Sequence, residues 1–128
     1  MRKVRVVIAD RFVETRGAIK HLLKRDPWIE VVGEISSCSE VIPTVSALRP
    51  DALLIDAMGQ MRGLEVIREL RALFPEIRII ALTDHSEEEY KRTTLAAGAD
   101  CWIPKIRLGK DLLPMVRALF PNGVQKVG

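Results

Sequence analysis

Two aspartates, a threonine and a lysine each follow a short apolar run, and their chemistry points to a phosphoryl group. These residues are Asp10, Asp56, Thr83 and Lys105. Two neighbouring carboxylates repel each other unless a cation or a proton lies between them, and their hard oxygens suit Mg²⁺. A carboxylate in such a site can attack an activated phosphoryl group, while a lysine ammonium and a threonine hydroxyl bind its oxygens. We therefore predict a transient phosphoanhydride on Asp56.

Asp56 ends the most informative apolar run of the chain. The run Ala52–Ile55 follows a Pro50-Asp51 turn, which is typical of a strand buried on both faces of a parallel sheet. Open α/β sheets bind ligands at the carboxyl ends of such strands. The alternative is that Asp56 caps the next helix, but that helix is expected to begin near Gly63, too far along the chain for a cap. The functional interpretation is therefore favoured.

Strands and helices alternate along the whole chain. Apolar runs predict strands at Val4–Ala9, Ile29–Ile35, Asp51–Asp56, Ile77–Leu82 and Asp100–Ile103. Amphipathic segments predict helices at residues 13–25, 40–48, 63–74, 86–97 and 111–120. Ser39 and Ser86 are expected to start the second and fourth helices, and Gly98 to end the fourth. Pro43 and Pro114 are expected in the first turns of their helices.

Strands that alternate with helices predict a parallel sheet covered on both faces, with right-handed crossovers. The predicted fold class is α/β, a flavodoxin-like (βα)5 three-layer sandwich with a five-stranded sheet of order 2-1-3-4-5. We prefer this order to a Rossmann half because it makes strands one and three neighbours at the topological switch point. Asp10 and Asp56 would then lie side by side, with Thr83 and Lys105 at the same edge.

Length and composition indicate one ordinary globular domain. The chain has 128 residues and a net charge of +3, and its basic residues are scattered, so direct nucleic-acid binding is not expected. Cys38 and Cys101 lack metal-ligand spacing and are expected to be reduced, buried thiols. Arg5 and Asp10 interrupt the apolar run after the basic N-terminus, which argues against a signal peptide, and no apolar segment is long enough to span a bilayer. These features predict a cytoplasmic protein without a membrane partner.

Over essentially its whole length, the chain resembles the response-regulator receiver domain of bacterial two-component systems. Any one matching segment alone would be weak evidence, and the resemblance is specific because the segments recur in the family's order and spacing. They are Val7-Ile8-Ala9-Asp10, Pro50-Asp51 through Asp56, Gly63-Leu64-Glu65, Leu82-Thr83, Ala97-Gly98-Ala99-Asp100 and Lys105.

The resemblance implies a role for each candidate site residue. Asp56 would be the phosphoacceptor, supplied by a histidine kinase, and Thr83 and Lys105 would sense the phosphoryl group. Asp10, Asp56 and the backbone carbonyl of Met58 would hold Mg²⁺. No enzymatic activity is expected beyond self-catalysed phosphotransfer to Asp56 and hydrolysis from it.

The resemblance also implies partners and a domain boundary. Residues 1–121 would form the receiver, and residues 122–128 a tail or the start of a linker to a helix-turn-helix transcriptional domain outside this chain. Trp102 stands where the family usually has a switch aromatic; an aromatic packed between the last strand and helix is an equally good interpretation. The surface of the fourth helix, last strand and final helix would contact a partner or a second copy in a homodimer, unless it is simply solvated. That surface includes Tyr90, Lys91, Trp102 and Lys110.

Two charged residues depart from the family pattern. Arg11 occupies the second of two consecutive acidic positions after the first strand, and Asp84 adds an acid after the fourth. Counted with the two aspartates and the lysine of the site, Arg11 makes the charge zero, or one negative if Asp84 points inward. Such a site has little electrostatic attraction for Mg²⁺. Arg11 is expected to pair bidentately with Asp56, which would weaken the metal site and block attack.

Two hypotheses remain open from the sequence. In the first, the chain is a phosphorylatable receiver that switches a partner or output domain. In the second, it is an atypical pseudo-receiver, a protein-interaction module that works without phosphorylation. The first is favoured on the family pattern. An aspartate-nucleophile phosphohydrolase would need an acid where Phe12 stands, and a flavodoxin would need a hydroxyl-rich loop in place of residues 11–14, so both are discounted.

Overall fold

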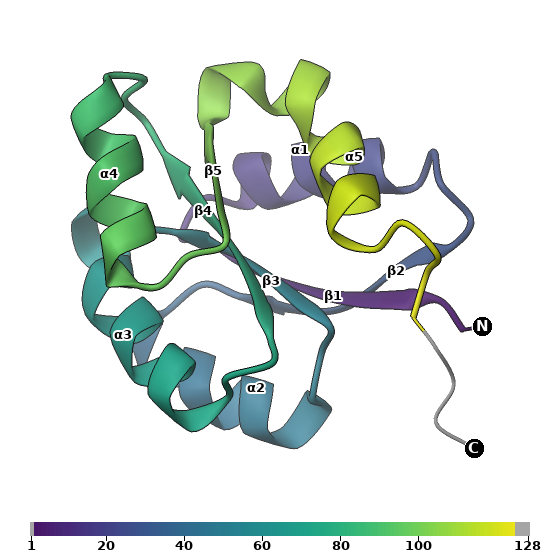
Figure 1. Cartoon of the computed structure of the whole chain (residues 1–128), viewed down its shortest axis with the longest axis horizontal. Helices are drawn as coiled ribbons and strands as arrows, with labels where there is room; N and C mark the ends of the chain where they lie inside the picture. Colours follow the sequence, from purple (N-terminus) through teal and green to yellow (C-terminus); the bar gives the residue numbers. More distant parts are fainter. Residues whose placement is uncertain (1, 125–128) are drawn as a thin grey trace.

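The computed structural model describes residues 2–124, apart from the side chain of Gln60. Its strands are β1 (Val4–Ala9), β2 (Ile29–Ile35), β3 (Ala52–Asp56), β4 (Arg78–Thr83) and β5 (Cys101–Pro104). Its helices are α1 (Val13–Leu23), α2 (Val41–Leu48), α3 (Gly63–Leu73), α4 (Glu88–Ala97) and α5 (Leu108–Leu119). The strands form one parallel sheet of order β2-β1-β3-β4-β5 (Figure 1). The predicted fold class and strand order are confirmed.

Parallel pairing brings the carboxyl ends of the central strands level with one another. Ala9 of β1 pairs with Ile55 of β3, which pairs with Ala81 of β4, which pairs with Trp102 of β5. Every residue of β3 is buried, as expected for a strand in the middle of a covered sheet. Whatever follows these strands therefore lies at one edge of the sheet.

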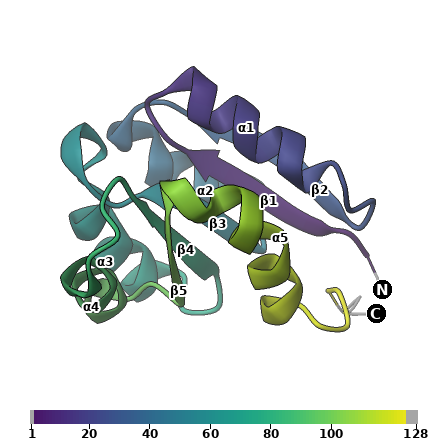
Figure 2. The same cartoon turned by 90° about the horizontal axis from the view of Figure 1, so that it is seen from above.

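Helices cover both faces of the sheet (Figures 1 and 2). Ile8 and Leu54 belong to a core cluster with buried residues of α1 and α5, whereas Val7 and Leu53 belong to a second cluster with those of α2, α3 and α4. Successive residues of a strand point to opposite faces, so both faces of β1 and β3 must be apolar. This explains the continuous apolar runs at residues 6–9 of β1 and 52–55 of β3.

Two predicted helix starts are wrong, and two other signals are confirmed. A 3-10 turn at Cys38–Glu40 contains Ser39 and precedes α2, and α4 begins at Glu88, so neither Ser39 nor Ser86 starts a helix. Glu88 and Glu89 lie in the first turn of α4, which the helix dipole favours. Pro43 lies in the first turn of α2, and Gly98 follows α4 with a φ of 123°, as predicted.

Pro114 lies in the middle of α5, which corrects the prediction that it belongs to the first turn. The helix begins at Leu108, earlier than expected, so Pro114 is an interior residue. It cannot donate to the carbonyl of Lys110, a loss of about 3 kcal/mol in a helix interior. Leu108, Leu112 and Val116 are buried at intervals of one turn. Their burial against the sheet offsets this cost, so tertiary packing decides the helix boundary.

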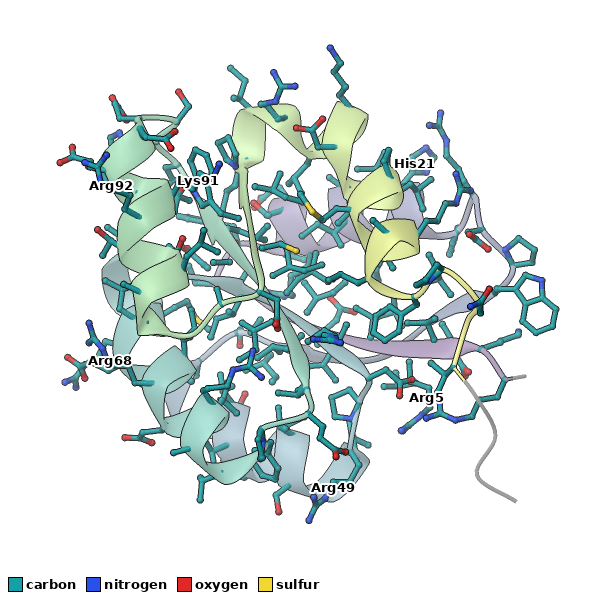
Figure 3. All side chains as sticks on the ribbon, in the orientation of Figure 1. Arg5, His21, Arg49, Arg68, Lys91 and Arg92 are labelled. Carbon is teal, nitrogen blue, oxygen red and sulfur yellow. The ribbon has the colours of Figure 1, made fainter. Side chains whose placement is uncertain are left out.

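Three expectations about the outside of the molecule can be compared with the structure. Figure 3 shows the labelled basic side chains, among them Arg5, Arg68 and Arg92, pointing outward from separate parts of the molecule, in line with a scattered charge. Cys38 and Cys101 are free thiols, but they are only half-buried: Cys38 lies in the 3-10 turn before α2, and Cys101 packs against the outside of a core cluster. No helix within residues 2–124 is long and apolar enough to cross a membrane.

Gly63 allows α3 to begin directly against the end of β3. A Cβ atom at residue 63 would overlap the carbonyl oxygen of Asp56 and the Cα atom of Ala57. Arg62, just before it, has a φ of 50°, in the left-handed region that turns the chain into the helix. The start of α3 therefore fixes the backbone of Asp56.

We predict that Gly63→Ala lowers the free energy of unfolding by about 2 kcal/mol, because α3 must move away from β3 to admit the new methyl group. Urea denaturation followed by circular dichroism measures this change. Gly17→Ala is the matched control: Gly17 lies inside α1 with open space around its Cα, so alanine should stabilise the protein by about 0.5–1 kcal/mol. Equal stability of Gly63→Ala and the parent would show that the close approach is not needed.

Candidate functional site

The four residues selected by their chemistry lie at the carboxyl edge of the sheet. Asp10 directly follows β1, Asp56 ends β3, Thr83 ends β4, and Lys105 directly follows β5. Asp10 and Thr83 are completely buried, and Asp56 is 4% exposed. The structure brings these residues to one place at the switch point between β1 and β3, as the strand order predicted.

The ammonium of Lys105 lies between the two buried carboxylates. Its Nζ atom is 2.8 Å from Oδ2 of Asp10 and 3.4 Å from Oδ2 of Asp56. A third carboxylate, that of exposed Asp84, approaches Nζ to 3.5 Å. Oδ2 of Asp10 makes no hydrogen bond of regular geometry, so its contact with Lys105 is an ion pair. Lysine thus supplies the cation that paired carboxylates require.

Tight turns of the backbone orient both carboxylates. The N–H of Phe12 donates to Oδ1 of Asp10 at 2.9 Å, and the N–H of Met58 donates to Oδ1 of Asp56 at 3.1 Å. In each turn an aspartate accepts from the N–H two residues further on. One oxygen of each carboxylate is therefore fixed by the backbone, and the other, Oδ2, faces Lys105.

The hydroxyl of Thr83 links this edge of the sheet to Trp102. Oγ1 of Thr83 donates to the backbone carbonyl of His85 at 2.6 Å and accepts a hydrogen bond from the indole N–H of Trp102 at 2.8 Å. A hydroxyl has only one proton to donate. Thr83 can therefore donate to a new acceptor only by releasing His85.

Comparison with known protein families explains why these features occur together. The model of the response regulator receiver domain matches residues 6–117 of the chain. The chain belongs to this family. The receiver is 31% identical over 115 residues to the DNA-binding transcriptional activator DevR/DosR of Mycobacterium tuberculosis, and 33% identical over 115 residues to the response regulator protein VraR of Staphylococcus aureus. Each alignment covers 89% of this chain but only 53% and 55% of those proteins, so the receiver spans about half the length of the curated relatives it matches.

Solved receiver structures have the same fold. The isolated REC domain of RcsB from Salmonella enterica serovar Typhimurium aligns with a TM-score of 0.85 at 23% identity, covering 97% of this receiver and 93% of that chain. The signal receiver domain of NarL from Mycobacterium tuberculosis aligns with a TM-score of 0.78 at 25% identity, covering 91% and 98%. These alignments support the flavodoxin-like receiver fold independently of the sequence motifs.

Arg11 does not pair with Asp56, so that prediction from the sequence is wrong. The guanidinium carbon of Arg11 lies 4.7 Å from the centroid of the Phe12 ring, and no ion pair joins Arg11 to a carboxylate in the part of the chain that is described. Lys105 is already the partner of Asp56, and an exposed guanidinium is satisfied by water and an aromatic face. With Asp84 on Lys105, the receiver site has three carboxylates and one ammonium, a charge of two negative rather than zero.

The oxygens of this receiver site fit Mg²⁺. Between residues 2 and 124, no three side chains of His, Cys, Asp or Glu come together to hold a metal ion. Mg²⁺, however, commonly takes one or two carboxylates and keeps several waters. The buried Oδ2 of Asp10 is free of regular hydrogen bonds, and Oδ2 of Asp56 faces the same point. Together with the negative charge, these two carboxylates suit a hard divalent cation, in contrast to the charge count made from the sequence.

Sequence reasoning missed two residues that support Asp10 in this receiver. Phe12 provides the N–H for Asp10, and its ring centroid lies 5.5 Å from Nζ of Lys105. Arg16 donates to the backbone carbonyl of Asp10 at 2.6 Å and pairs with Glu34 of β2 at 3.0 Å. The sequence spacing gives a partial indication of the role of Arg16. Arg16 lies about one helical turn after Phe12, so its side chain is expected at the same end of α1.

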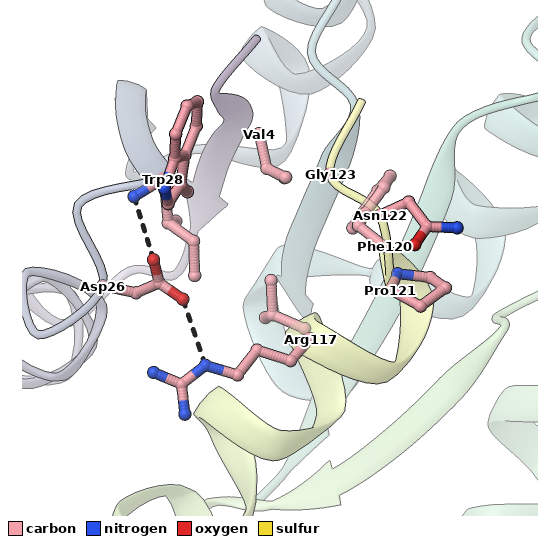
Figure 4. A pocket seen from close by; sticks show the side chains of 10 residues that line it. Val4, Asp26, Trp28, Arg117, Phe120, Pro121, Asn122 and Gly123 are labelled. Carbon is pink, nitrogen blue, oxygen red and sulfur yellow. Dashed lines mark hydrogen bonds and ion pairs between the residues drawn. The ribbon is translucent and has the colours of Figure 1, made fainter. Parts of the chain in front are cut away.

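A separate groove lies at the opposite, amino edge of the receiver's sheet (Figure 4). Its volume is about 660 Å³, and it is lined by the start of β1 and β2 and the end of α5. Its carboxylate, Asp26, already accepts from the N–H of Trp28 at 2.9 Å and from Arg117 at 3.0 Å. We assign function to the strand-end site and not to this groove, because none of the four predicted site residues lines it.

Burial makes ionisation of the receiver's phosphoacceptor candidate unfavourable. It raises the pKa of Asp56 above its ordinary value, and the neighbouring charge of Asp10 raises it further, while Met58 and Lys105 offset only part of the effect. Burial also acts to lower the pKa of Lys105, but its contact with Asp10 and the charges of Asp56 and Asp84 outweigh burial, so that pKa is raised. Lys105 therefore stays protonated between the carboxylates.

We predict that Asp56→Asn stabilises the receiver by about 1 kcal/mol near neutral pH. Because the pKa of Asp56 is raised in the folded protein, its ionised form disfavours folding. That cost is absent below the unfolded pKa of about 3.9, where Asp56 is protonated in both states, and is complete above the folded pKa. The advantage of Asn should therefore shrink as pH falls, which urea denaturation at several pH values measures.

The same substitution at Asp51 is the matched control. Asp51 accepts hydrogen bonds from the Arg2 guanidinium at 2.7 and 2.8 Å and from the N–H of Arg5 at 2.8 Å. Asp51→Asn should therefore lower the stability of the receiver. A loss of stability in Asp56→Asn near neutral pH would contradict the interpretation of Asp56 as a carboxylate held at a cost to folding.

Proposed function

We propose that this receiver accepts a phosphoryl group on Asp56 from a histidine kinase in the cytoplasm and switches a partner or output domain. The observation that carries the proposal is the position of Lys105, whose ammonium lies between Asp10 and Asp56 at the end of the sheet. A nucleophilic carboxylate next to a fixed cation is suited to phosphoryl chemistry. Membership of the receiver family supports the same reaction.

Asp56 supplies the nucleophilic oxygen in this reaction. Its Oδ1 is held by the N–H of Met58, which leaves Oδ2, facing Lys105, to attack phosphorus. An O–P bond forms on Asp56 as the bond from phosphorus to the imidazole nitrogen of the kinase breaks, and the imidazole keeps the electron pair. The new phosphoryl group then lies beside Lys105, whose ammonium can pair with its oxygens.

Asp10, Asp56 and the carbonyl of Met58 are the groups we propose to hold Mg²⁺. When bound, the ion would neutralise charge on the phosphoryl oxygens during transfer. The receiver's own residues orient the reactants: the N–H of Phe12 and the N–H of Met58 hold the two carboxylates in fixed directions before any ligand arrives.

Thr83 and Trp102 are the residues we propose to report the phosphorylated state. An oxygen of the phosphoryl group would compete with the carbonyl of His85 for the single proton of Thr83. Because Trp102 donates to the same hydroxyl at 2.8 Å, movement of Thr83 changes the environment of the indole. The hydrogen bond supports the switch interpretation of Trp102 over simple packing.

The output of the receiver is proposed from its relatives. DevR/DosR is named a DNA-binding transcriptional activator, and DegU of Brevibacillus brevis, 27% identical over 122 residues, a transcriptional regulatory protein. We therefore propose residues 1–121 as the receiver and the following residues as a linker to a helix-turn-helix domain. Residues 121–124 pack on the domain, since the carbonyl of Val124 accepts from the N–H of Arg2 at 3.0 Å, whereas residues 125–128 lie outside the described part.

The face formed by α4, β5 and α5 is the surface we propose for a partner or a second copy. A hollow of about 690 Å³ lies there, and its lining includes Lys91 and Trp102. Tyr90 stacks on His85 with the ring centroids 4.9 Å apart, next to the residue whose carbonyl accepts from Thr83. A change at Thr83 would therefore reach this face directly.

We predict that acetyl phosphate adds one phosphoryl group to the receiver in the presence of Mg²⁺, because Asp56 is free of Arg11 and lies beside Lys105. Intact mass spectrometry measures the gain. Chelation with EDTA should abolish it, and Asp56→Asn should not gain mass. Arg11→Asp should change the extent of phosphorylation by no more than about twofold, as expected for a charge that is exposed and not paired with Asp56.

The same measurement decides between the two hypotheses left by the sequence. No mass gain in the parent would favour a phosphorylation-independent interaction module. No gain in the parent but a clear gain in Arg11→Asp would show that Arg11 does block the site.

We predict that phosphorylation changes the fluorescence of Trp102 through Thr83. In a Trp28→Phe background Trp102 is the only tryptophan, because the sequence has two. Acetyl phosphate with Mg²⁺ should alter its emission, and Thr83→Val should remove that response while mass spectrometry still detects phosphorylated Asp56. An unchanged response in Thr83→Val would rule out the hydroxyl as the link.

A further inference from the structure

Asp84 is a carboxylate of the site that the phosphoryl chemistry described above does not use. Its side chain is 63% exposed, whereas Asp10 is completely buried, yet both contact the ammonium of Lys105. Within residues 2–124, Lys105 is the one side chain with which Asp84 forms an ion pair, at 3.5 Å. An exposed acid directed at a lysine in the interior of the site suggests a role in placing that lysine.

A divalent cation at the two buried carboxylates would conflict with the present position of Lys105. Nζ is 2.8 Å from Oδ2 of Asp10, the same oxygen that a cation would take. Like charges repel, and Nζ lies closer to Oδ2 of Asp10 (2.8 Å) than to Oδ2 of Asp56 (3.4 Å), so we expect a divalent ion between the two oxygens to displace Lys105 from Asp10 first. The carboxylate of Asp84 is already within 3.5 Å and is the remaining anion that can receive the ammonium without removing it from Asp56.

We propose that Asp84 is a positioning residue, which holds Lys105 beside Asp56 when a divalent cation takes Asp10. From the position directly after β4, it thereby supplies the third negative charge that is absent at position 11, where this chain has arginine. The inference rests on the proposed function, because it concerns the cation and the lysine of that site. Asp84 acts through Lys105 and is not itself a ligand of the cation, in agreement with the absence of a three-carboxylate metal cluster in the described residues.

The test measures cation affinity directly. Mn²⁺ takes the same oxygen ligands as Mg²⁺, and electron paramagnetic resonance measures its free concentration in a titration of the full chain. Asp84→Asn should raise the Kd for Mn²⁺ about tenfold, since the lysine then stays on Asp10 and competes with the cation for its carboxylate. Glu87→Gln is the matched control: its side chain is also 63% exposed, but it does not contact Lys105, so the Kd should change by less than about twofold.

A double-mutant cycle distinguishes positioning of Lys105 by Asp84 from a direct effect of the Asp84 charge on the cation. In a Lys105→Met background no ammonium competes for Asp10, so Asp84→Asn should change the Kd by less than about twofold there. A tenfold effect in both backgrounds would overturn the proposal, because Asp84 would then act as a charge or a ligand independent of Lys105. An unchanged Kd in the single variant Asp84→Asn would overturn it as well.

Failure of this inference can be told apart from failure of the proposed function. If the parent gains a phosphoryl group in the presence of Mg²⁺ and Asp84→Asn binds Mn²⁺ like the parent, only the role of Asp84 is wrong. If the parent binds no Mn²⁺, both the role of Asp84 and the metal-dependent part of the proposed function are overturned. Circular dichroism of each variant establishes that it is folded, which is expected for an exposed position such as residue 84.

Discussion

The ion pairs of one lysine with two buried aspartates are the constraint on which the rest of the structure depends. Asp10 and Asp56 come from neighbouring strands and lose nearly all contact with water, so their mutual repulsion has to be balanced inside the protein. Lys105 balances it from the end of β5, across the sheet. The three strand ends must therefore keep their register, and the parallel sheet with its apolar faces is what keeps it.

The surroundings of this ion pair are built from backbone more than from side chains. Oδ1 of each aspartate is fixed by a backbone N–H, and the carbonyl of Asp56 lies under the first residue of α3. These N–H groups lie in tight turns, each between the end of a strand and the helical turn that follows, so we expect them to reorient less than a side chain when charge changes nearby. The side chains that can move are Lys105, Asp84 and Thr83, and these are the ones whose contacts we expect to rearrange.

The fold could be predicted from the sequence because its central strands, β1, β3 and β4, are almost entirely buried on both faces. Burial on both faces produces apolar runs in the sequence. The polar residue after each of these runs marks the edge of the sheet where the site lies. Helix starts were less predictable: α5 starts at Leu108 because burial of its apolar face outweighs the cost of Pro114. The local sequence does not show which of these two effects is larger, because the gain from burial depends on what the helix packs against.

Charge in the site was the part that sequence reasoning predicted least well. Composition gives the number of charged residues but not which of them share a low-dielectric environment. Arg11 and Asp84 both stand next to site residues in the chain, yet the structure directs Arg11 onto Phe12 and Asp84 onto Lys105. A turn of the backbone at each strand end decides which neighbour points inward, and this makes the site more negative than the charge count from the sequence.

α5 joins the turn that carries Lys105 to the opposite, amino edge of the sheet. A 3-10 turn at Lys105–Arg107 leads directly into α5, whose 12 residues extend about 18 Å. The helix ends near the amino edge of the sheet, where Val124 bonds to Arg2. Because Leu108, Leu112 and Val116 of α5 are buried in the core, any displacement of α5 would require that apolar face to repack against the sheet.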